Sequence, residues 1–358
     1  MGSKKAATLF LYPHSVRYDK VIKITIKAES ELLVGGGSLE QALSPFDIPV
    51  AKMPYSDMLI PYIPGSTLKG LIRSAAEEVL REHAQQGEKI SLKELWEQIK
   101  IEDRGREEYA EYVEKAVFKL LDQFVEIKRK SARDLLSAEG STLYEKVKKY
   151  YQDYTDVDAV LERIIITPYA CYTTVEGLAC ELPLREYKKI HLDALRAALE
   201  EDFPYPCPVC LTFGAPGYAS NVAVTDAYPV GELGKDYMVL TRDHVAIDRL
   251  TGAAAEGKLF TVEYVTAGAE FVGYVLVKNV SNCNYIDLNT ELEKWKRGEE
   301  NCVHYAVLMK ALERLKKQAS LGRRKSAGMG RVSIDFSLDS DSCDAYHPPL
   351  RELCRALY

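Results

Sequence analysis

Hydrophobic residues change their spacing between residues 21 and 80. The segment VIKITIKAES (21–30) alternates apolar and polar residues, which is typical of a half-buried β-strand. Near Ser66 or Thr67, either of which would be a favourable N-cap, the period becomes that of an α-helix with one apolar face. This face comprises Leu68, Leu71, Ile72, Ala75, Ala76, Val79 and Leu80. A strand and an amphipathic helix are therefore predicted, joined by a loop.

The rest of the chain favours an α+β fold. Residues 81–163 are highly charged and follow a helical period, which predicts an inserted helical subdomain. Strand-like segments return after residue 163, and a last helix is expected over roughly 301–320. Strands around isolated helices do not suit a doubly wound parallel sheet. We therefore divide the chain into residues 1–80, the insert, and residues 164–358.

Composition is that of a globular protein, with 47% hydrophobic and 28% charged residues among 358. No run approaches the length of a membrane span, and the apolar stretch near the N-terminus is too short for a signal peptide. We expect a cytoplasmic protein without a membrane partner. The eight cysteines are spread between Cys171 and Cys354, which favours reduced thiols with at most one metal site over a disulfide framework.

Charge is unevenly distributed along the chain. The net charge of −6 argues against a domain that is basic throughout, as many nucleic-acid binders are. The segment RLKKQASLGRRKSAGMGR (314–331), in contrast, has seven basic residues and no acidic one. Such a run is usually a solvated helix end, but this one enters a glycine-rich loop and precedes the strand-like RVSIDFSL. Both interpretations stay open from the residues alone.

Two cations stand at the start of the helix that follows Pro64. Lys69 and Arg73 lie in its first turns, where free N–H groups and the macrodipole favour acidic side chains. Gly65 and Gly70 flank the site and would allow an anion to approach the backbone closely. GSTLKG does not continue as the Gly-Lys-Ser/Thr of a P-loop, so nucleotide hydrolysis is not expected. We favour an anion site over an ordinary capped helix.

The segment CPVC, with Cys207 and Cys210, is half of a zinc knuckle. No second pair follows at the usual spacing, so further ligands would have to come from Cys171, Cys180 or His191. We choose Cys180, His191, Cys207 and Cys210 as the candidate ligands of a structural zinc ion. Two structural thiols in a tight turn are the alternative. A redox role is disfavoured, because LTFGAPG does not continue as a helix that would lower the pKa of a thiol.

Two further side chains are candidates for chemistry. Asp47 lies in SPFDIPVAKMP, within a proline-rich loop (38–64) that lacks periodicity, and long loops in compact domains are often functional. Loop carboxylates more often cap or turn the backbone, so the residues alone do not favour catalysis. His244, in TRDHVAIDRLTG, could contact a ligand, although a structural histidine is the commoner case. No Ser/His/Asp set can be argued from spacing.

Five of these segments, in order, resemble the repeat-associated RNA-binding (RAMP) superfamily of CRISPR proteins. IPYIPGSTLKGLIRS is similar to its glycine-loop and helix signature. FDIPVAKMP is similar to the preceding loop of the multi-copy backbone subunits of type III effector complexes, the Csm and Cmr type. CPVCLTFGAPG resembles their Cys-containing FG turn, and VAIDRLTGAAAEGKLFTVEYV resembles the segment with their thumb hairpin. GRRKSAGMGRVSI is similar to their C-terminal glycine-rich loop. The motifs span residues 43–334, and residues 81–163 match nothing in the family.

The resemblance implies a modified RRM-like (ferredoxin-like) core with a thumb β-hairpin and a large helical insertion, which polymerises along CRISPR RNA in antiviral defence. The glycine loop and first helix would hold guide phosphates, contacts that carry no sequence information, and sequence would be read by guide pairing. The thumb would wedge between guide bases. The residues assigned to RNA are Gly65, Ser66, Lys69, Gly70, Arg73, His244, Asp248, Arg249, Arg323, Arg324, Lys325, Gly328 and Gly330.

The resemblance also implies a role for Asp47. In cleaving backbone subunits an aspartate in this loop cuts target RNA with a divalent ion, Mg²⁺ or Mn²⁺, by activating a ribose 2′-hydroxyl. A carboxylate can act there as a general base or a metal ligand. Asp47 matches the position of that residue, and Asp57 in the same loop matches it less well.

Four functions remain as hypotheses. The first is a type III backbone subunit that binds CRISPR RNA, target RNA and other subunits, including copies of itself or paralogues, and cuts through Asp47. The second is a non-cleaving structural or capping subunit, which the large insert favours. The third is a guide-processing endoribonuclease, although such proteins lack IPGSTLKG and often rely on histidine. The fourth is a zinc-containing enzyme that binds a phosphorylated small molecule.

Overall fold

The computed structural model describes residues 8–9, 16–35, 44–55, 57–85, 87–95, 157–172, 180, 203–204, 206–247, 254–283 and 287–338. The chain forms two compact units. The first comprises residues 1–75, 221–285 and 308–358, and the second comprises residues 76–220 and 286–307. Each unit is described by itself. The predicted insert belongs to the second unit, and its residues 96–156 lie outside the described part of the chain.

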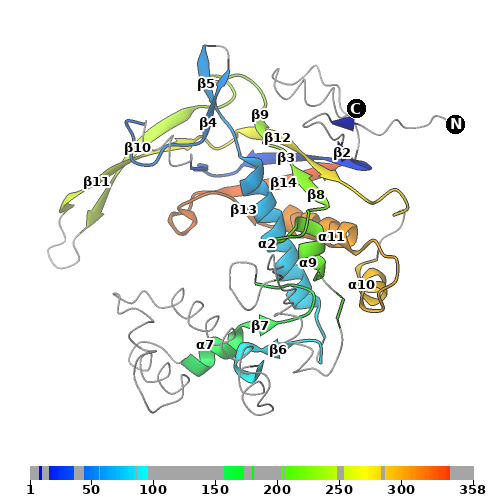
Figure 1. Ribbon diagram of the computed structural model, residues 1–358. Coiled ribbons are helices and arrows are strands. Elements are labelled where there is room, and N and C mark those ends of the chain that lie inside the picture. Colours follow the sequence, from blue (N-terminus) through cyan, green and yellow to red (C-terminus); the bar gives the residue numbers. More distant parts are fainter. Residues whose placement is uncertain are drawn as a thin grey trace. The chain divides into compact units, whose positions relative to one another are not determined.

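A six-stranded antiparallel sheet forms the core of the first unit (Figure 1). Its strands are β3 (Lys20–Ala28), β8 (Val222–Val224), β9 (Tyr228–Pro229), β12 (Glu270–Val277), β13 (Ala319–Ser320) and β14 (Arg331–Ser337). They follow the order β13-β14-β3-β12-β8, and β9 also pairs with β12. The predicted closing strand RVSIDFSL is thus confirmed as β14.

Two helices complete the topology. Helix α2 (Gly65–His83) lies between β3 and β8 in the chain, and α11 (Val303–Lys317) lies between β12 and β14. The chain order is strand, helix, strand, strand, helix, strand. The last of these strands pairs with the first, the first with the third and the third with the second, as in an RRM-like (ferredoxin-like) core. The predicted α+β class is therefore confirmed.

Burial follows the predicted hydrophobic patterns. In β3 the side chains of Ile22, Ile24, Ile26 and Ala28 are buried and alternate with more exposed neighbours. Strand β12 is buried from Phe271 to Val277, as expected of a strand paired on both sides. The predicted stripe of α2 is buried at Leu68, Ile72, Ala75, Ala76 and Leu80 and partly exposed at Leu71 and Val79. A further apolar cluster of the sheet comprises Tyr18, Val272, Tyr274 and Leu276.

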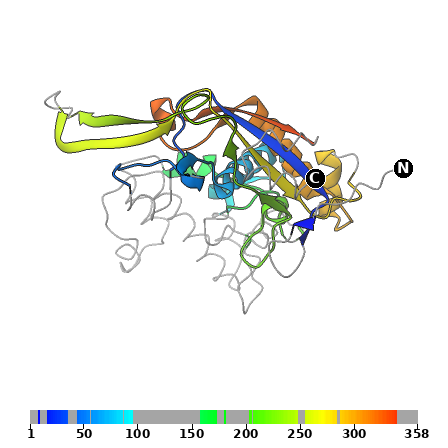
Figure 2. The ribbon, with the colours of Figure 1, turned by 90° about the horizontal axis from the view of Figure 1, so that it is seen from above.

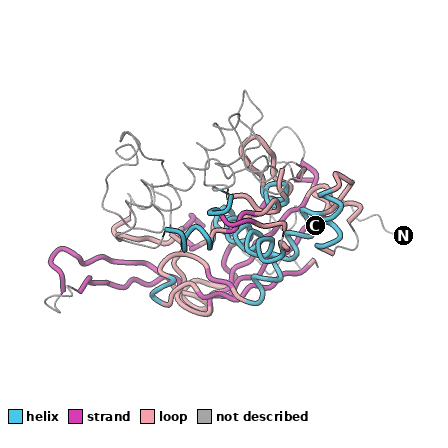
Figure 3. The backbone as a smooth tube through the Cα atoms, turned by 90° about the horizontal axis from the view of Figure 1, so that it is seen from below, coloured by secondary structure: helices cyan, strands magenta, loops and turns pink. Residues whose placement is uncertain are grey.

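A long hairpin projects from the sheet (Figures 2 and 3). Strands β10 (Val239–Ile247) and β11 (Ala254–Val265) pair antiparallel, and residues 248–253 at the tip lie outside the described residues. At its base, the Leu32 N–H donates to the Val265 carbonyl at 2.9 Å. The hairpin occupies the position at which the sequence predicted a thumb.

The proline-rich loop is more regular than predicted. It contains a short hairpin of β4 (Lys52–Tyr55) and β5 (Met58–Pro61). The hydrophobic pattern missed this hairpin because two prolines lie within it, Pro54 and Pro61, and its outer side chains are exposed. Strands β1 (Thr8–Leu9) and β2 (Val16–Arg17) form a separate pair, and the 3₁₀ turn η1 (Lys325–Ala327) lies in the C-terminal glycine-rich loop.

The second unit has short elements. They are β6 (Ile90–Ser91), α7 (Val157–Arg163), β7 (Ile165–Ile166), α9 (Pro208–Phe213) and α10 (Leu288–Lys296). The rings of Tyr169 and Trp295 meet edge to face at 5.9 Å, and the Tyr169 hydroxyl donates to Glu88 at 2.7 Å. Lys296 pairs with the same carboxylate, and these contacts lower the pKa of Glu88 despite its partial burial. Across the described residues, no helix combines the length and the apolar character that crossing a membrane requires.

Candidate nucleic-acid interface

Asp47 lies along the outer edge of strand β11, beside Thr261 in the half of that strand nearer the sheet, which we call the hairpin base. Its Oδ2 accepts the Thr261 N–H at 2.7 Å. The next residue, Ile48, donates its N–H to the Thr261 carbonyl at 3.2 Å and accepts the Glu263 N–H at 3.0 Å. The Asp47 carboxylate is thus exposed but held in place by backbone groups of the hairpin.

A buried carboxylate fastens the segment that follows Asp47. Glu263 is 3% exposed, its Oε2 accepts the Val50 N–H at 3.2 Å, and its Oε1 pairs with Lys52 Nζ at 2.5 Å. A buried charge is tolerated when it is paired and hydrogen-bonded, as this one is. Glu263 was not among the residues expected from the sequence, although a lone acid between the apolar residues Val262 and Tyr264 was a signal of such a role.

A second exposed carboxylate lies beside Thr261. Asp243 Oδ1 accepts the Thr261 hydroxyl at 2.7 Å, while the N–H of the same threonine binds Asp47. Carboxylate oxygens are the donors that Mg²⁺ and Mn²⁺ prefer, so the donor type fits a divalent ion. Among the residues that the structure describes, Asp47 belongs to no group of three or more acidic, histidine or cysteine ligands.

The hairpin meets the C-terminal glycine-rich loop through an aromatic stack. The rings of His244 and Phe260, paired across the hairpin, stack with centroids 5.4 Å apart. The Arg324 guanidinium lies 5.2 Å from the Phe260 centroid and 3.4 Å from His244 Nδ1. Burial, followed by the charges of Arg324 and Arg242, lowers the pKa of His244. The structure therefore brings His244 and Arg324 together and adds Phe260, which was not among the residues expected from the sequence.

The glycine-rich loop requires glycine for its backbone geometry. A Cβ on Gly330 would lie 2.2 Å from the Leu321 carbonyl oxygen, and φ is +82° there. Arg324 has φ of +60°, which is unusual for a residue with a side chain. Gly328 also has a positive φ but faces open space. The side chains of Arg323 and Lys325 are exposed, whereas Asp248 and Arg249 lie outside the described residues.

The start of helix α2 differs from the prediction. The helix begins at Gly65, so Ser66 and Thr67 lie inside it and neither is the N-cap. The Gly65 N–H donates to Asp226 Oδ1 at 2.7 Å, which places an acidic side chain at the positive end of the helix. A Cβ on Gly65 would lie 2.4 Å from the Val224 carbonyl oxygen. The close packing of Gly65 against β8 leaves no room for a side chain there, whereas Gly70 faces open space.

Three cations gather beyond that helix start. Burial lowers the pKa of Lys69, and the charges of Arg73 and Lys278 lower it further. Lys278 follows β12, far away in sequence, and its Nζ lies 5.5 Å from the ring centroid of Tyr18. The spacing of residues along α2 could not reveal this third cation. A polyanion bound here would reduce the repulsion within the group.

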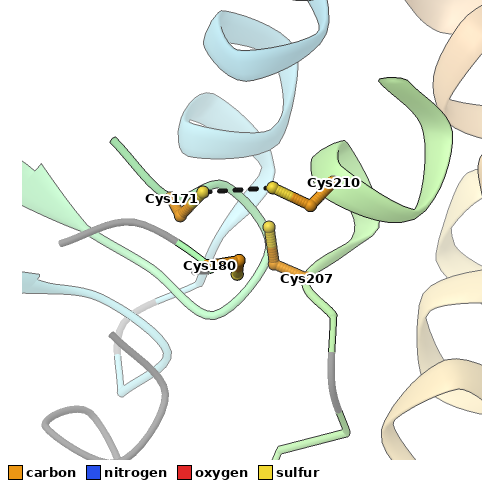
Figure 4. Close-up of side chains that lie close together, drawn as sticks. All are labelled: Cys171, Cys180, Cys207 and Cys210. Carbon is orange, nitrogen blue, oxygen red and sulfur yellow. Dashed lines mark hydrogen bonds between the residues drawn. The ribbon is translucent and has the colours of Figure 1, made fainter. Parts of the chain in front are cut away.

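Four cysteines of the second unit lie together. The sulfur atoms of Cys171, Cys180, Cys207 and Cys210 are all within 4.8 Å of one another and buried, and Cys171 Sγ lies 3.3 Å from Cys210 Sγ (Figure 4). Hydrogen bonds with the other three thiols, together with burial, raise the pKa of Cys171. The fourth candidate ligand, His191, lies outside the described residues.

Two sequence expectations about the cysteines are wrong. Helix α9 runs three residues past Cys210 before Gly214 ends it, whereas no continuing helix was expected. Cys283 and Cys302 each take part in a disulfide, whereas the spread of the cysteines favoured reduced thiols.

Comparison with known proteins identifies the family of the chain. The sequence model of the RAMP superfamily matches residues 25–333. The protein therefore belongs to the RAMP superfamily. Among solved structures it is similar to a chain described as "Type IV-B CRISPR Complex", with 12% identity, 90% of this chain and 92% of that chain covered, and a TM-score of 0.39. No curated protein matches the sequence.

Proposed function

We propose that this protein is a CRISPR-associated subunit that binds a guide RNA along the base of hairpin β10–β11 and the glycine-rich loop. The contact between His244, Phe260 and Arg324 carries the proposal. It joins the hairpin to the loop through an arginine and two aromatic rings, groups on which nucleic-acid bases stack. Membership of the RAMP superfamily supports the same assignment.

The cations near α2 support a contact with the sugar-phosphate backbone. Burial lowers the pKa of Lys69, and the neighbouring charges of Arg73 and Lys278 lower it further. Asp226 already accepts the first N–H of the helix, so we assign the phosphate to these side chains and to the open surface at Gly70. Backbone contacts of this type give affinity without sequence preference.

We propose further that the protein is a backbone subunit of a type III effector complex and cuts target RNA through Asp47. Thr261 holds the carboxylate of Asp47 at the hairpin base, where a target strand paired to the guide would pass. Asp47 would act as general base or metal ligand, and a divalent ion would lower the pKa of the 2′-hydroxyl and stabilise the phosphorane charge. Its partners would be other subunits, including copies of itself or paralogues.

RNA binding by the full chain tests the first proposal. We expect single-stranded repeat-derived RNA to bind with a strong salt dependence. Arg324→Ala should weaken binding about tenfold, and Lys69→Ala should reduce the salt slope by about one phosphate contact. Lys310→Ala is the matched control, because this exposed lysine of α11 pairs with Glu313 outside the candidate interface. Equal losses in all three variants would argue against a defined site.

A non-cleaving subunit is the second candidate. One observation favours it: among the described residues, Asp47 is not part of a three-ligand group, and its carboxylate already accepts a backbone N–H. Cleavage by the assembled complex, with Asp47→Asn and Asp57→Asn compared, decides between the candidates. The cleaving subunit predicts a rate about a hundredfold lower for Asp47→Asn alone, with guide binding unchanged. Equal rates in the wild type and Asp47→Asn would support the non-cleaving subunit.

A further inference from the structure

Three separate segments of the second unit bring their thiols to one point. Cys171 follows β7, Cys180 lies nine residues further along, and Cys207 and Cys210 are at the start of α9. A backbone hydrogen bond from Val209 N–H to the Tyr169 carbonyl, at 3.3 Å, joins two of these segments directly beside the thiols. Backbone hydrogen bonding therefore helps to hold two of the thiol-bearing segments together.

The spacing of the sulfur atoms matches one metal ion. Four sulfurs on a tetrahedral Zn²⁺, each at about 2.3 Å, lie about 3.8 Å from one another. In the structure all four lie within 4.8 Å of one another, and each thiol is buried. A cluster of several metal ions between the thiols would need a wider separation. We propose that Cys171, Cys180, Cys207 and Cys210 bind a single structural Zn²⁺ as four thiolates.

The chemistry of the donor set favours zinc. Four soft sulfur ligands in a tetrahedral arrangement suit Zn²⁺, and a site closed by four protein ligands has no open position for substrate. This ligand set replaces the one expected from the sequence, because Cys171 occupies the position that had been given to His191. Metal binding would release the protons of the four thiols and leave a net charge of −2 on the ion and its ligands.

A cation stands beside the site. Arg81 Nη2 lies 3.5 Å from the Cys171 carbonyl oxygen, and its guanidinium lies 4.3 Å from the ring centroid of Tyr172. The Arg81 Nε–H is buried and has no acceptor among the described residues. The same guanidinium pairs with Glu77 at 3.5 Å, so only part of its positive charge is left to offset the negative charge of a tetrathiolate site.

The ion would close a loop in the chain. Bound to Cys180 and Cys207, it would hold together the two ends of residues 181–206, and Cys171 would tie them to β7. Closing the loop in this way removes conformational freedom from the unfolded chain and stabilises the folded unit. The proposal does not depend on RNA binding, since its residues all belong to the second unit.

Metal analysis of the full chain tests the proposal. We expect one zinc per chain in protein purified without chelators and without a polyhistidine tag. Cys171→Ser should lower the zinc content about tenfold or more, since one thiolate is lost. His191→Ala should keep one zinc, and so should Cys343→Ser, a control for cysteine replacement. Metal-free wild type, iron in place of zinc, or loss of zinc in His191→Ala would each overturn the assignment.

Cobalt replacement gives a test that needs no variant. Co²⁺ bound by four thiolates has intense sulfur-to-metal charge-transfer bands and the visible spectrum of a tetrahedral ion. We expect that spectrum in the wild-type chain and its loss when zinc is added back. A spectrum of an octahedral ion, or one with fewer sulfur ligands, would contradict the four-cysteine site even if Cys171→Ser failed to fold.

Discussion

Asp47 at the hairpin base and the cysteines of the second unit are held in opposite ways. Asp47 is exposed, and a backbone N–H of β11 fixes its carboxylate. The four thiols are buried and lie against one another. The first arrangement leaves polar groups open to a large polar ligand, whereas the second suits a small ion shielded from water. Under the proposed function, changes at the hairpin base should therefore alter RNA binding or cutting, and changes at the cysteines should alter stability.

The largest effect is expected at the cysteines. Removing zinc with a chelator, or replacing Cys207 and Cys210 by Ser together, should lower the free energy of unfolding of the second unit by about 4 kcal/mol or more. Urea denaturation monitored by tryptophan fluorescence measures this, because Trp295 is buried in the same unit. RNA affinity of the folded protein should stay unchanged. If the folded protein without zinc also lost RNA affinity under native conditions, the two regions would not be independent.

A smaller effect is expected at the buried carboxylate below Asp47. Glu263→Gln keeps an acceptor for the Val50 N–H but leaves Lys52 without its counter-ion, which should cost about 1–2 kcal/mol of stability. Lys52 is partly exposed, and water therefore limits the loss. Lys52→Gln and the double variant complete a mutant cycle in urea. Additive losses would show that the pair contributes no coupling energy.

If Asp47 cuts RNA, the Glu263 and Lys52 variants also test whether these two residues hold Asp47 in position. Glu263→Gln should slow cutting while guide affinity is retained, since the Glu263 side chain holds Val50 and Lys52 in the segment that follows Asp47. If Glu263→Gln loses the expected stability but cuts RNA as fast as the wild type, the Glu263 contacts do not position Asp47.

The smallest effect is a pH dependence at His244. The structure lowers its pKa below 6.5, chiefly through burial and then through Arg324 and Arg242, against the opposite influence of Asp243 and Glu31. Between the lowered value and 6.5 the unfolded chain binds the proton more readily, so stability should fall as pH drops below about 6.5. His244→Phe keeps a ring against Phe260 and should flatten this slope. Identical thermal unfolding profiles of the two proteins from pH 5 to 7 would contradict the assignment.

Local patterns were sufficient to predict the elements of the core. The alternation in residues 21–30 and the stripe after Pro64 gave β3 and α2 because burial of one face decides both periods. The N-cap was predicted wrongly because Asp226, distant in sequence, accepts the Gly65 N–H and replaces a local capping side chain. Tertiary contacts override local preferences in this way.

The candidate sites were predictable only in part. Cys207 and Cys210 lie three positions apart in the sequence, whereas the path of the chain after β7 brings Cys171 to them. In the sequence, Phe260 and Glu263 look like ordinary strand residues. Their contact partners depend on the register of β11, which residue spacing alone does not predict.

The bonds that hold Asp47 also protect the hairpin. The outward N–H and C=O of Thr261 and the N–H of Glu263 are taken by residues 47 and 48, so this stretch of β11 is not an open strand edge. Open edges invite pairing with strands of other molecules and lead to aggregation. Under the proposed function, copies of this protein on one RNA would therefore come close at the hairpin base without joining into a continuous sheet.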